Sequence, residues 1–284
     1  MQKIKVSEIF FSTQGEARFV GVPSIFLRTF GCNFTCDGFG MPAGQRSQER
    51  HAIDPSQFRV IDDLPLVSTG CDSYLSWDPR FKHLSPFYTT AELGQKFRAL
   101  LPGHQWTLST GNDVHLVITG GEPLLGWQRA YPELLAAQMD SGLRNVTFET
   151  NGTQPIQDEL KKFITDPFGG DRIEFTFSIS PKLSASGEKW SDAVKPEVVA
   201  EYDQLGMAYL KFVVDRPEHF DEADQAVAEY RAAGFIGPAY VMPVGGVTSV
   251  YEGNRFNIAE TALARGYRYS PRLHIDIWGN AWAK

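Results

Sequence analysis

The sequence predicts an α/β protein, a partial (β/α) barrel of about six parallel strands formed by a single domain, residues 1–284. Three observations lead to this prediction. Short apolar segments with strand character alternate with helical segments along most of the chain, which is typical of parallel strands joined by crossover helices. These strands are fewer than the eight of a complete barrel. The sequence also contains no convincing linker or internal repeat.

The alternation begins with an apolar run at 23–30, expected as a strand. A helix is expected at 89–101, because Thr89 is followed three positions later by Glu92, the pattern of a capping box. The next expected elements are strand 114–119, helix 130–139, strand 144–150 and helix 158–164.

The second half of the chain continues in the same way, with strands expected at 172–180 and 208–215. The segment 221–234 is expected as a helix closed by a C-terminal glycine cap. Two further strands, 238–244 and 272–279, are expected around a helix at 256–266.

The main irregular segment is an insert at 37–70. It is too polar and too rich in glycine and proline to be core. Loops of this length without clear structure are usually functional or mobile.

Composition limits the classes of function. The formal net charge of −7 argues against a protein whose main function is to bind a nucleic acid backbone. It does not exclude a local basic pocket for an anionic substrate. No run approaches the roughly 18 apolar residues of a membrane span, and the N-terminus lacks the apolar core of a secretory signal. Three cysteines are too few for a disulfide framework in a chain of 284 residues. We therefore expect a cytoplasmic protein.

The cysteines carry the first chemical signal. Cys32 and Cys36 directly follow the first expected strand, and 34 residues separate Cys36 from Cys71. Three thiolates can hold three irons of a four-iron cluster and leave the fourth iron open. Two alternatives stay open at this point: Cys36 and Cys71 are unrelated small residues, or the cysteines form a zinc site with His51 or His83.

The segment "ITGGEPLL" (118–125) carries the second signal. It lies at the C-terminal end of an expected strand, where ligands bind in parallel α/β folds. Gly120 and Gly121 allow the backbone to approach a ligand, and Glu122 offers a carboxylate to an ammonium or hydroxyl group. A tight turn would explain the glycines but not the glutamate.

Taken together, these motifs resemble the radical S-adenosylmethionine (SAM) enzymes, and within them the 7-carboxy-7-deazaguanine synthases. The matching segments occur in the family's order over nearly the whole chain: "FFSTQGEARFVGVPSIFLRTFGCNFTC", "CDSYLSWD", "ITGGEPLL", "FETNGT", "SISPKLS", "YLKFVVD" and "RLHIDIWGNAWAK".

The resemblance implies a radical SAM fold, with a 4Fe–4S cluster on Cys32, Cys36 and Cys71 and SAM on the remaining iron. It implies that a 5′-deoxyadenosyl radical removes a hydrogen from C6 of 6-carboxy-5,6,7,8-tetrahydropterin. The ring then contracts to 7-carboxy-7-deazaguanine with loss of ammonia, a step of preQ0/queuosine-type 7-deazapurine biosynthesis. The protein orients the cofactors and excludes water.

The resemblance also assigns residues to each ligand. The residues matched to SAM are Gly121, Glu122, Glu149, Asn151, Ser180, Pro181, Lys182 and Lys211. Those matched to the substrate are Thr13, Gln14, Gly15, Glu16, Arg28, Thr119, His274 and Lys284. Arg28 would pair with the substrate carboxylate through its guanidinium fork, and Ser73 would bind Mg²⁺. Buried ion pairing explains Lys211 equally well, and a single histidine in a strand, such as His274, is more often structural.

The sequence departs from the family in the spacing of the third cysteine. The insert at 37–70 must loop out and return, which is tolerable because closure entropy rises only logarithmically with loop length. It could cap the site, bind the electron donor or bind another protein. A flavodoxin-like electron donor and a homodimer are expected by resemblance, and no direct nucleic acid contact is expected. The alternatives are another radical SAM enzyme, such as a glycyl-radical activase, and a non-catalytic zinc-binding protein.

Overall fold

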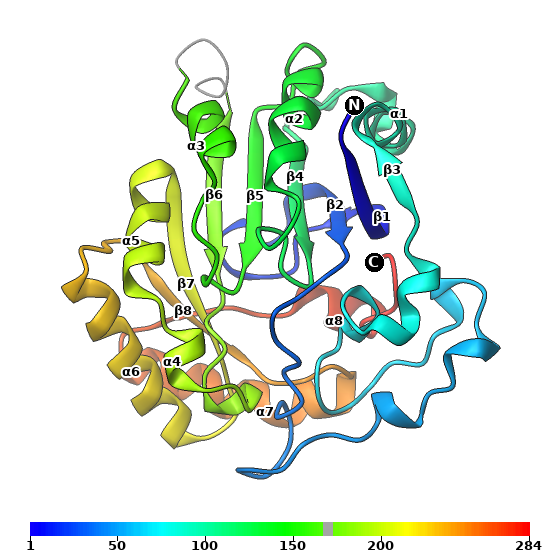
Figure 1. Cartoon of the computed structure of the whole chain (residues 1–284). Coiled ribbons are helices and arrows are strands. Elements are labelled where there is room, and N and C mark those ends of the chain that lie inside the picture. Colours follow the sequence, from blue (N-terminus) through cyan, green and yellow to red (C-terminus); the bar gives the residue numbers. More distant parts are fainter. Residues whose placement is uncertain (167–172) are drawn as a thin grey trace.

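The computed structural model describes residues 1–166 and 173–284 (Figure 1). Its centre is one sheet with the strand order β3-β1-β2-β4-β5-β6-β7-β8-β9. The strands are β1 (Lys3–Thr13), β2 (Pro23–Thr29), β3 (Phe87–Thr89), β4 (His115–Gly120), β5 (Asn145–Thr150), β6 (Glu174–Ile179), β7 (Met207–Val214), β8 (Ala239–Pro243) and β9 (Arg268–Tyr269). Arg172, the first residue of the strand expected at 172–180, lies outside the described residues.

The sheet is mostly parallel, as predicted. From β2 to β9, each strand pairs in parallel with the next one in the sheet. β1 lies antiparallel between β2 and β3. The expected strands form as β2, β4, β5, β6, β7 and β8, whereas β1, β3 and the short β9 were not expected. The sheet has two edge strands, β3 and β9, and is not closed.

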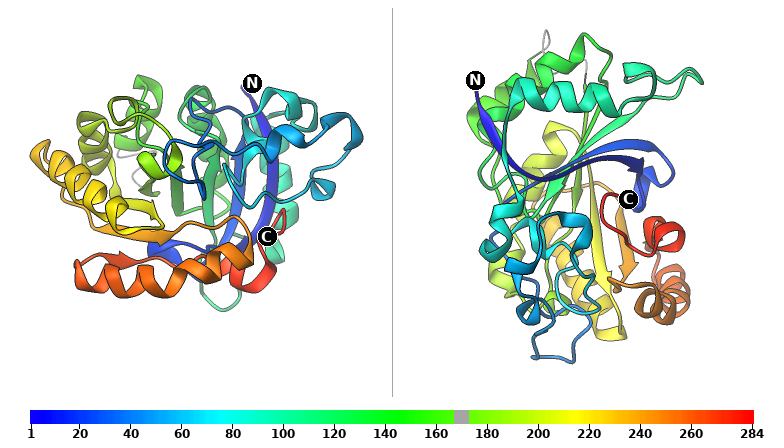
Figure 2. Two further views of the ribbon diagram at one scale, coloured as in Figure 1. Left: turned by 90° about the horizontal axis from the view of Figure 1, so that it is seen from below. Right: turned by 90° about the vertical axis from the view of Figure 1, so that its right-hand side faces the viewer.

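The helices are α1 (Thr90–Leu100), α2 (Tyr131–Met139), α3 (Asp158–Thr165), α4 (Trp190–Ala193), α5 (Pro196–Leu205), α6 (Pro217–Ala232), α7 (Thr248–Ala264) and α8 (Leu273–Trp278). The predicted capping box is present at Thr89 and Glu92. α6 and α7 begin earlier than expected, and α4 and α5 were not expected. Figure 2 places α7 and α8 on the opposite side of the molecule from α2 and α3.

The strand predicted at 272–279 is wrong, because this segment contains the helix α8. Its alternating apolar residues suggested a strand with one buried face. In the structure Ile275 is the buried residue of the helix, whereas Ile277 is 52% exposed. The Leu273 N–H donates to the Gly15 carbonyl, which fixes the start of the helix beside the loop after β1. His274 therefore reaches its neighbours from a helix and not from a strand.

The insert at 37–70 contains only short 3-10 turns, at Arg50–Ala52, Pro55–Gln57 and Ile61–Asp63. The expectation that it contributes nothing to a core is wrong in part. Leu64 and Val67 are buried in a small separate core together with Tyr74, Leu75 and Phe81. Figure 1 shows the insert on the side of the sheet where the parallel strands end.

The main core packs the sheet against its helices. Phe148 of β5 stacks near Phe177 of β6, with ring centroids 5.8 Å apart, and Phe177 stacks on Tyr202 of α5 at 4.7 Å. These three side chains are fully buried. This packing fixes the strands, and thereby the loops that follow their C-terminal ends. Among the described helices, none is long and apolar enough to cross a membrane.

Candidate active site

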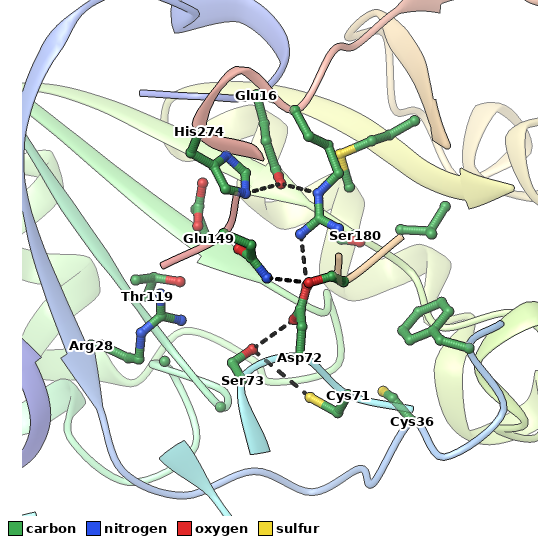
Figure 3. Close-up of a pocket in the computed structure, with 18 of the residues that line it drawn as sticks. Glu16, Arg28, Cys36, Cys71, Asp72, Ser73, Thr119, Glu149, Ser180 and His274 are labelled. Carbon is green, nitrogen blue, oxygen red and sulfur yellow. Dashed lines mark hydrogen bonds and ion pairs between the residues drawn. The ribbon is translucent and has the colours of Figure 1, made fainter. Parts of the chain in front are cut away.

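A pocket of about 240 Å³ opens at the C-terminal ends of the parallel strands (Figure 3). All of the residues assigned to the site from the sequence line this pocket, except Thr13, Gly15, Glu122 and Pro181. Figure 3 shows Cys36 and Cys71 at one end of the pocket and Glu16 with His274 at the other. Because parallel strands bring their C-terminal loops to one edge, segments far apart in the sequence meet here.

The three cysteines form one wall of the pocket. All three are free thiols, with Cys36 buried and the other two partly buried. They pack together with Phe34, Phe39 and Ala193. The insert thus returns Cys71 to the loop that holds Cys32 and Cys36, and the three cysteines belong to one site.

The loop that bears Cys36 is held in an unusual backbone conformation. Cys36 has a φ of 52°, in the left-handed region that non-glycine residues rarely occupy. The Thr35 and Cys36 N–H groups both donate to the Glu188 carboxylate at 2.9 Å. A Cβ atom on Gly38 would lie 2.5 Å from the Gly187 nitrogen, so only glycine permits this contact. The segment around Glu188 therefore fixes the cysteine loop, a role that the sequence analysis missed.

The thiols have the chemistry of cluster ligands. Burial raises the pKa of Cys32 to about 12 and also raises the pKa values of Cys36 and Cys71. Cations at the sulfur atoms would reverse this shift, because a coordinating thiol is deprotonated. Three such thiols beside an open pocket match the ligand set of a four-iron cluster with one accessible iron.

A zinc site with a histidine fits less well. His51 and His83 are exposed and do not line the pocket. Within residues 1–166 and 173–284, no group of three or more His, Cys, Asp or Glu side chains is arranged to hold a single metal ion. A cluster differs from a single ion because its ligands bind separate iron atoms.

The Gly-Gly-Glu segment after β4 supports the cysteine loop. A Cβ atom on Gly121 would lie 2.8 Å from the Cys32 Cβ and 2.3 Å from the Gly31 carbonyl oxygen. Glu122 lies fully buried beneath the pocket, where its carboxylate accepts hydrogen bonds from the Thr150 hydroxyl (2.8 Å) and the Asn151 N–H (2.6 Å). Burial raises the pKa of Glu122 to about 7. Glu122 thus joins the loops after β4 and β5, and its carboxylate is absent from the pocket wall.

Four of the other residues matched to SAM, Asn151, Ser180, Pro181 and Lys182, belong to the loops after β5 and β6. Asn151 donates from its side-chain amide to Asn33, between the first two cysteines, at 2.9 Å. The Lys182 ammonium donates to the Ser180 hydroxyl at 3.0 Å, after β6. Pro181, between them, is buried outside the pocket lining.

At the opposite end, a network of charged side chains surrounds Glu16. Its carboxylate accepts from Lys211 of β7 and from the Arg272 Nε (3.2 Å), and the His274 Nε2 lies 4.0 Å away. Arg272 also donates to Asp72 at 2.7 Å. Burial alone would raise the pKa of Glu16, but the neighbouring cations hold that pKa well below its ordinary value.

This network also sets the charges of its basic members. Burial opposes the charge on Lys211, yet the Glu16 and Glu149 carboxylates raise its pKa above the usual value. Burial, together with the Arg272 charge, lowers the pKa of His274 to about 4, so its imidazole is neutral at pH 7. Lys211, which the sequence matched to SAM, donates to Glu16 in the structure, and its assignment to SAM stays a prediction. Arg272 and Asp72 were missed, since nothing in their local sequence marks them.

A third group of residues surrounds Arg28. Its Nε donates to the Glu8 carboxylate of β1 at 2.6 Å, and Glu8 also accepts from the Ala283 N–H at 3.0 Å. Glu8 therefore holds Arg28 together with the tail segment next to Lys284. Figure 3 shows Arg28 beside Thr119. Glu8 was missed because the β1 strand itself was not expected.

Three remaining residues complete the comparison with the sequence. Ser73 lines the pocket, with its hydroxyl 3.3 Å from Asp72 Oδ1 and 3.8 Å from Cys71 Sγ. Gly15 does not line the pocket but lies directly against His274, where a Cβ atom on Gly15 would fall 2.2 Å from His274 Nδ1. The buried Thr13 hydroxyl has no hydrogen-bond partner in the described part of the chain.

Comparison with known proteins places this site in context. No family model matches the sequence. A 7-carboxy-7-deazaguanine synthase of Pyrobaculum aerophilum is 29% identical over 282 residues, covering 99% of this chain and 98% of the relative. A second, from Halobacterium salinarum, is also 29% identical, with coverage of 98% and 91%. The chain resembles the 7-carboxy-7-deazaguanine synthases over nearly its whole length.

The resemblance predicted from the sequence motifs is therefore confirmed. The crystal structure of QueE from Escherichia coli has the same fold, with a TM-score of 0.56 over 96% of this chain and 95% of that chain. The sequence identity to QueE is 19%, so this likeness concerns the fold.

Proposed function

We propose that this protein is a radical SAM enzyme that converts 6-carboxy-5,6,7,8-tetrahydropterin to 7-carboxy-7-deazaguanine with loss of ammonia. The observation that carries the proposal is that one pocket contains three free thiols at one end and the Glu16 and Arg28 groups farther along. The full-length similarity to 7-carboxy-7-deazaguanine synthases supports it.

In this proposal Cys32, Cys36 and Cys71 hold a 4Fe–4S cluster, and SAM lies beside it against Gly121, Asn151, Ser180 and Lys182. When bound, the cluster and SAM supply the one-electron chemistry. The absence of side chains on Gly120 and Gly121 lets this segment pack directly against Thr29 of β2 and against Gly31, since Cβ atoms there would lie 2.1 Å and 2.3 Å from their carbonyl oxygens. The protein's part is to position the ligands and to exclude water.

The pterin would occupy the opposite end of the pocket. A carboxylate such as Glu16 can accept hydrogen bonds from the amino and ring N–H groups of a pterin, and Gln14 offers both a donor and an acceptor. Gln14 is itself oriented, because its amide donates to Glu149 at 3.1 Å. The Arg28 guanidinium, fixed through its Nε by Glu8, would bind the substrate carboxylate with its terminal nitrogens.

Several further assignments belong to the same proposal. Ser73 would contribute a hydroxyl to Mg²⁺, which needs few protein ligands when substrate and water oxygens complete its shell. We also propose a flavodoxin-like electron donor, a homodimer, a cytoplasmic location and a place in queuosine-type biosynthesis. These assignments rest on the resemblance to the family.

The decisive experiment uses the whole protein reconstituted anaerobically with iron and sulfide. It combines SAM, a reductant, Mg²⁺ and 6-carboxy-5,6,7,8-tetrahydropterin, and measures 7-carboxy-7-deazaguanine by mass spectrometry. We expect the product to form only when all components are present. SAM cleavage without this product would support a radical SAM enzyme but reject the proposed substrate. A colourless, iron-free protein after reconstitution would reject both.

A further inference from the structure

One cysteine sulfur receives a hydrogen bond from a side chain of the segment that follows the insert. The Trp77 indole N–H donates to Cys71 Sγ at 3.3 Å. Both residues line the pocket. The Cys32 sulfur, in contrast, accepts from a backbone group, the Phe34 N–H, at 3.4 Å. Cys71 is thus the ligand whose environment a side-chain substitution can change most directly.

The insert supplies the residue that holds this indole in place. The Arg50 guanidinium lies over the Trp77 ring, 4.6 Å from the ring centroid. Arg50 is only 8% exposed, so the contact is shielded from water. A cation on the face of an indole is attracted to the ring, more strongly when both are desolvated. The ring is therefore held on its face by Arg50 and at its edge by Cys71.

Arg50 is itself fixed by two buried carboxylates. Its Nε and one terminal nitrogen donate to Asp37 at 3.0 and 3.1 Å, and the other terminal nitrogen donates to Asp78 at 2.7 Å. Asp37 directly follows Cys36, and Asp78 directly follows Trp77. A single arginine from within the insert therefore links the second cysteine to the segment that contacts the third.

A hydrogen bond to a ligating sulfur changes the electronic properties of an iron–sulfur cluster. The donor stabilises negative charge on the sulfur, and this charge is greater in the reduced cluster than in the oxidised one. Hydrogen bonds to the sulfurs therefore belong to the factors that set the reduction potential. Removal of such a bond lowers the potential.

We propose that Trp77, positioned by Arg50 of the insert, raises the reduction potential of the cluster through its hydrogen bond to Cys71. This inference rests on the proposed function, because it requires a cluster on the three cysteines. The proposal assigns a function to the insert, because Arg50 orients the indole that contacts Cys71.

The test is an anaerobic redox titration of the reconstituted protein, followed by electron paramagnetic resonance of the reduced cluster. We expect Trp77→Phe to have a lower midpoint potential than wild type at equal iron and sulfide content. Arg50→Lys, which keeps the charge but loses the planar fork, is expected to shift the potential in the same direction. A wild-type potential in Trp77→Phe would overturn the proposal. A wild-type potential in Arg50→Lys would show that Arg50 does not position the indole and would overturn that part of the proposal.

Two matched controls separate this effect from general perturbation. Trp190→Phe removes an indole that donates to Glu229, away from the pocket. Arg231→Lys alters an arginine that also lies over an aromatic ring, that of Phe235 at 5.0 Å, away from the pocket. Both controls are expected to retain the wild-type potential. A shift in either control as large as that of Trp77→Phe would overturn the proposal.

A second variant covers the case in which Trp77→Phe fails to hold iron. Replacement of Trp77 by 3-benzothienylalanine keeps the ring shape but has no N–H group. A lowered potential in this protein supports the hydrogen bond, whereas a wild-type potential shows that only the ring is needed and overturns the proposal. If wild type itself binds no cluster, the proposed function fails, and this result is distinct from an unchanged potential in a loaded variant.

Discussion

The Lys211 ammonium donates to the Glu16 carboxylate inside the pocket, although 195 positions separate the two residues. Both side chains are largely buried, with exposed fractions of 6% and 14%. The pair joins β7 to the loop after β1, and Arg272 adds a second cation on the same carboxylate. The end of the pocket opposite the cysteines thus depends on buried charges that compensate one another.

Lys211→Met is expected to destabilise the protein, because it leaves the buried Glu16 carboxylate with less compensation. Breaking a buried pair typically costs about 3–5 kcal/mol, and we expect the low end because Arg272 remains. The measurement is the free energy of unfolding from urea titrations. Lys161→Met, which breaks the surface pair with Glu201, is the matched control and should change stability far less. Equal losses in the two variants would contradict the buried-pair argument.

Cys71→Ala is expected to lose the cluster and the activity together, as is Cys32→Ala. The reason is that each thiol would bind one iron of the same cluster. Iron content, sulfide content and visible absorbance after anaerobic reconstitution provide the measurement. If Cys71→Ala retained iron and turnover, Cys71 would not be a ligand.

Arg28→Ala is expected to weaken substrate binding by about 1.5–3 kcal/mol, the usual effect of losing a charge-assisted hydrogen bond. Because Arg28 also pairs with Glu8, unfolding is measured alongside binding. Arg28→Lys is the companion variant, since it keeps the charge but loses the planar fork. Affinity at the wild-type level in Arg28→Ala would exclude the carboxylate contact.

Gly15→Ala is expected to displace His274 and reduce substrate affinity while leaving iron content unchanged. The new methyl group would lie 2.2 Å from His274 Nδ1 and 3.1 Å from the His274 backbone nitrogen, so the imidazole must move and the start of α8 must shift slightly. Overpacking of this kind typically costs about 1–3 kcal/mol. Gly126→Ala is the control, because a Cβ atom there meets nothing within 4 Å. Similar substrate affinities in the two variants would show that α8 does not position the substrate.

The acid sensitivity of the protein is expected to include a contribution from His274. Its pKa falls from an ordinary value of 6.5 to about 4 in the folded protein, so between these values the unfolded chain binds more protons. The free energy of unfolding should therefore decrease as the pH drops from 6.5 to 4, by about 2–3 kcal/mol. His274→Gln should lack this component. Parallel curves of unfolding free energy against pH for wild type and variant would refute the assignment.

The parallel strands could be predicted because each is a short apolar run, and buried parallel strands have that composition. β1 was missed although Ile4 and Val6 are fully buried, because charged residues interrupt its apolar pattern. α8 was assigned wrongly because its alternation of apolar residues matched a strand, while its burial is decided by contacts with the loop at Gly15. The spacing of apolar residues predicts secondary structure only where those residues are the ones that become buried in the fold.

The site was predictable to the extent that its residues belong to short motifs. Cys32, Cys36 and Gly121 could be found from their neighbours in the sequence. Arg272, in contrast, contacts Asp72 across 200 positions, and Glu188 reaches the cysteine loop across 152. Such partners become visible only when the chain is folded, because their local sequence carries no sign of the distant group they bind.

The insert is closed at its base and open at its tip. Arg50 joins Asp37 to Asp78, and the Gly70 N–H donates to the Phe39 carbonyl at 2.8 Å, so the two arms are bonded close to the thiols. Arg59 and Val60, at the far end, are exposed. Because closure entropy depends weakly on loop length, foreign sequence placed between these two residues should disturb the cysteines little. The tip is therefore a natural attachment point for an affinity tag or a fluorescent reporter, introduced in the middle of the chain.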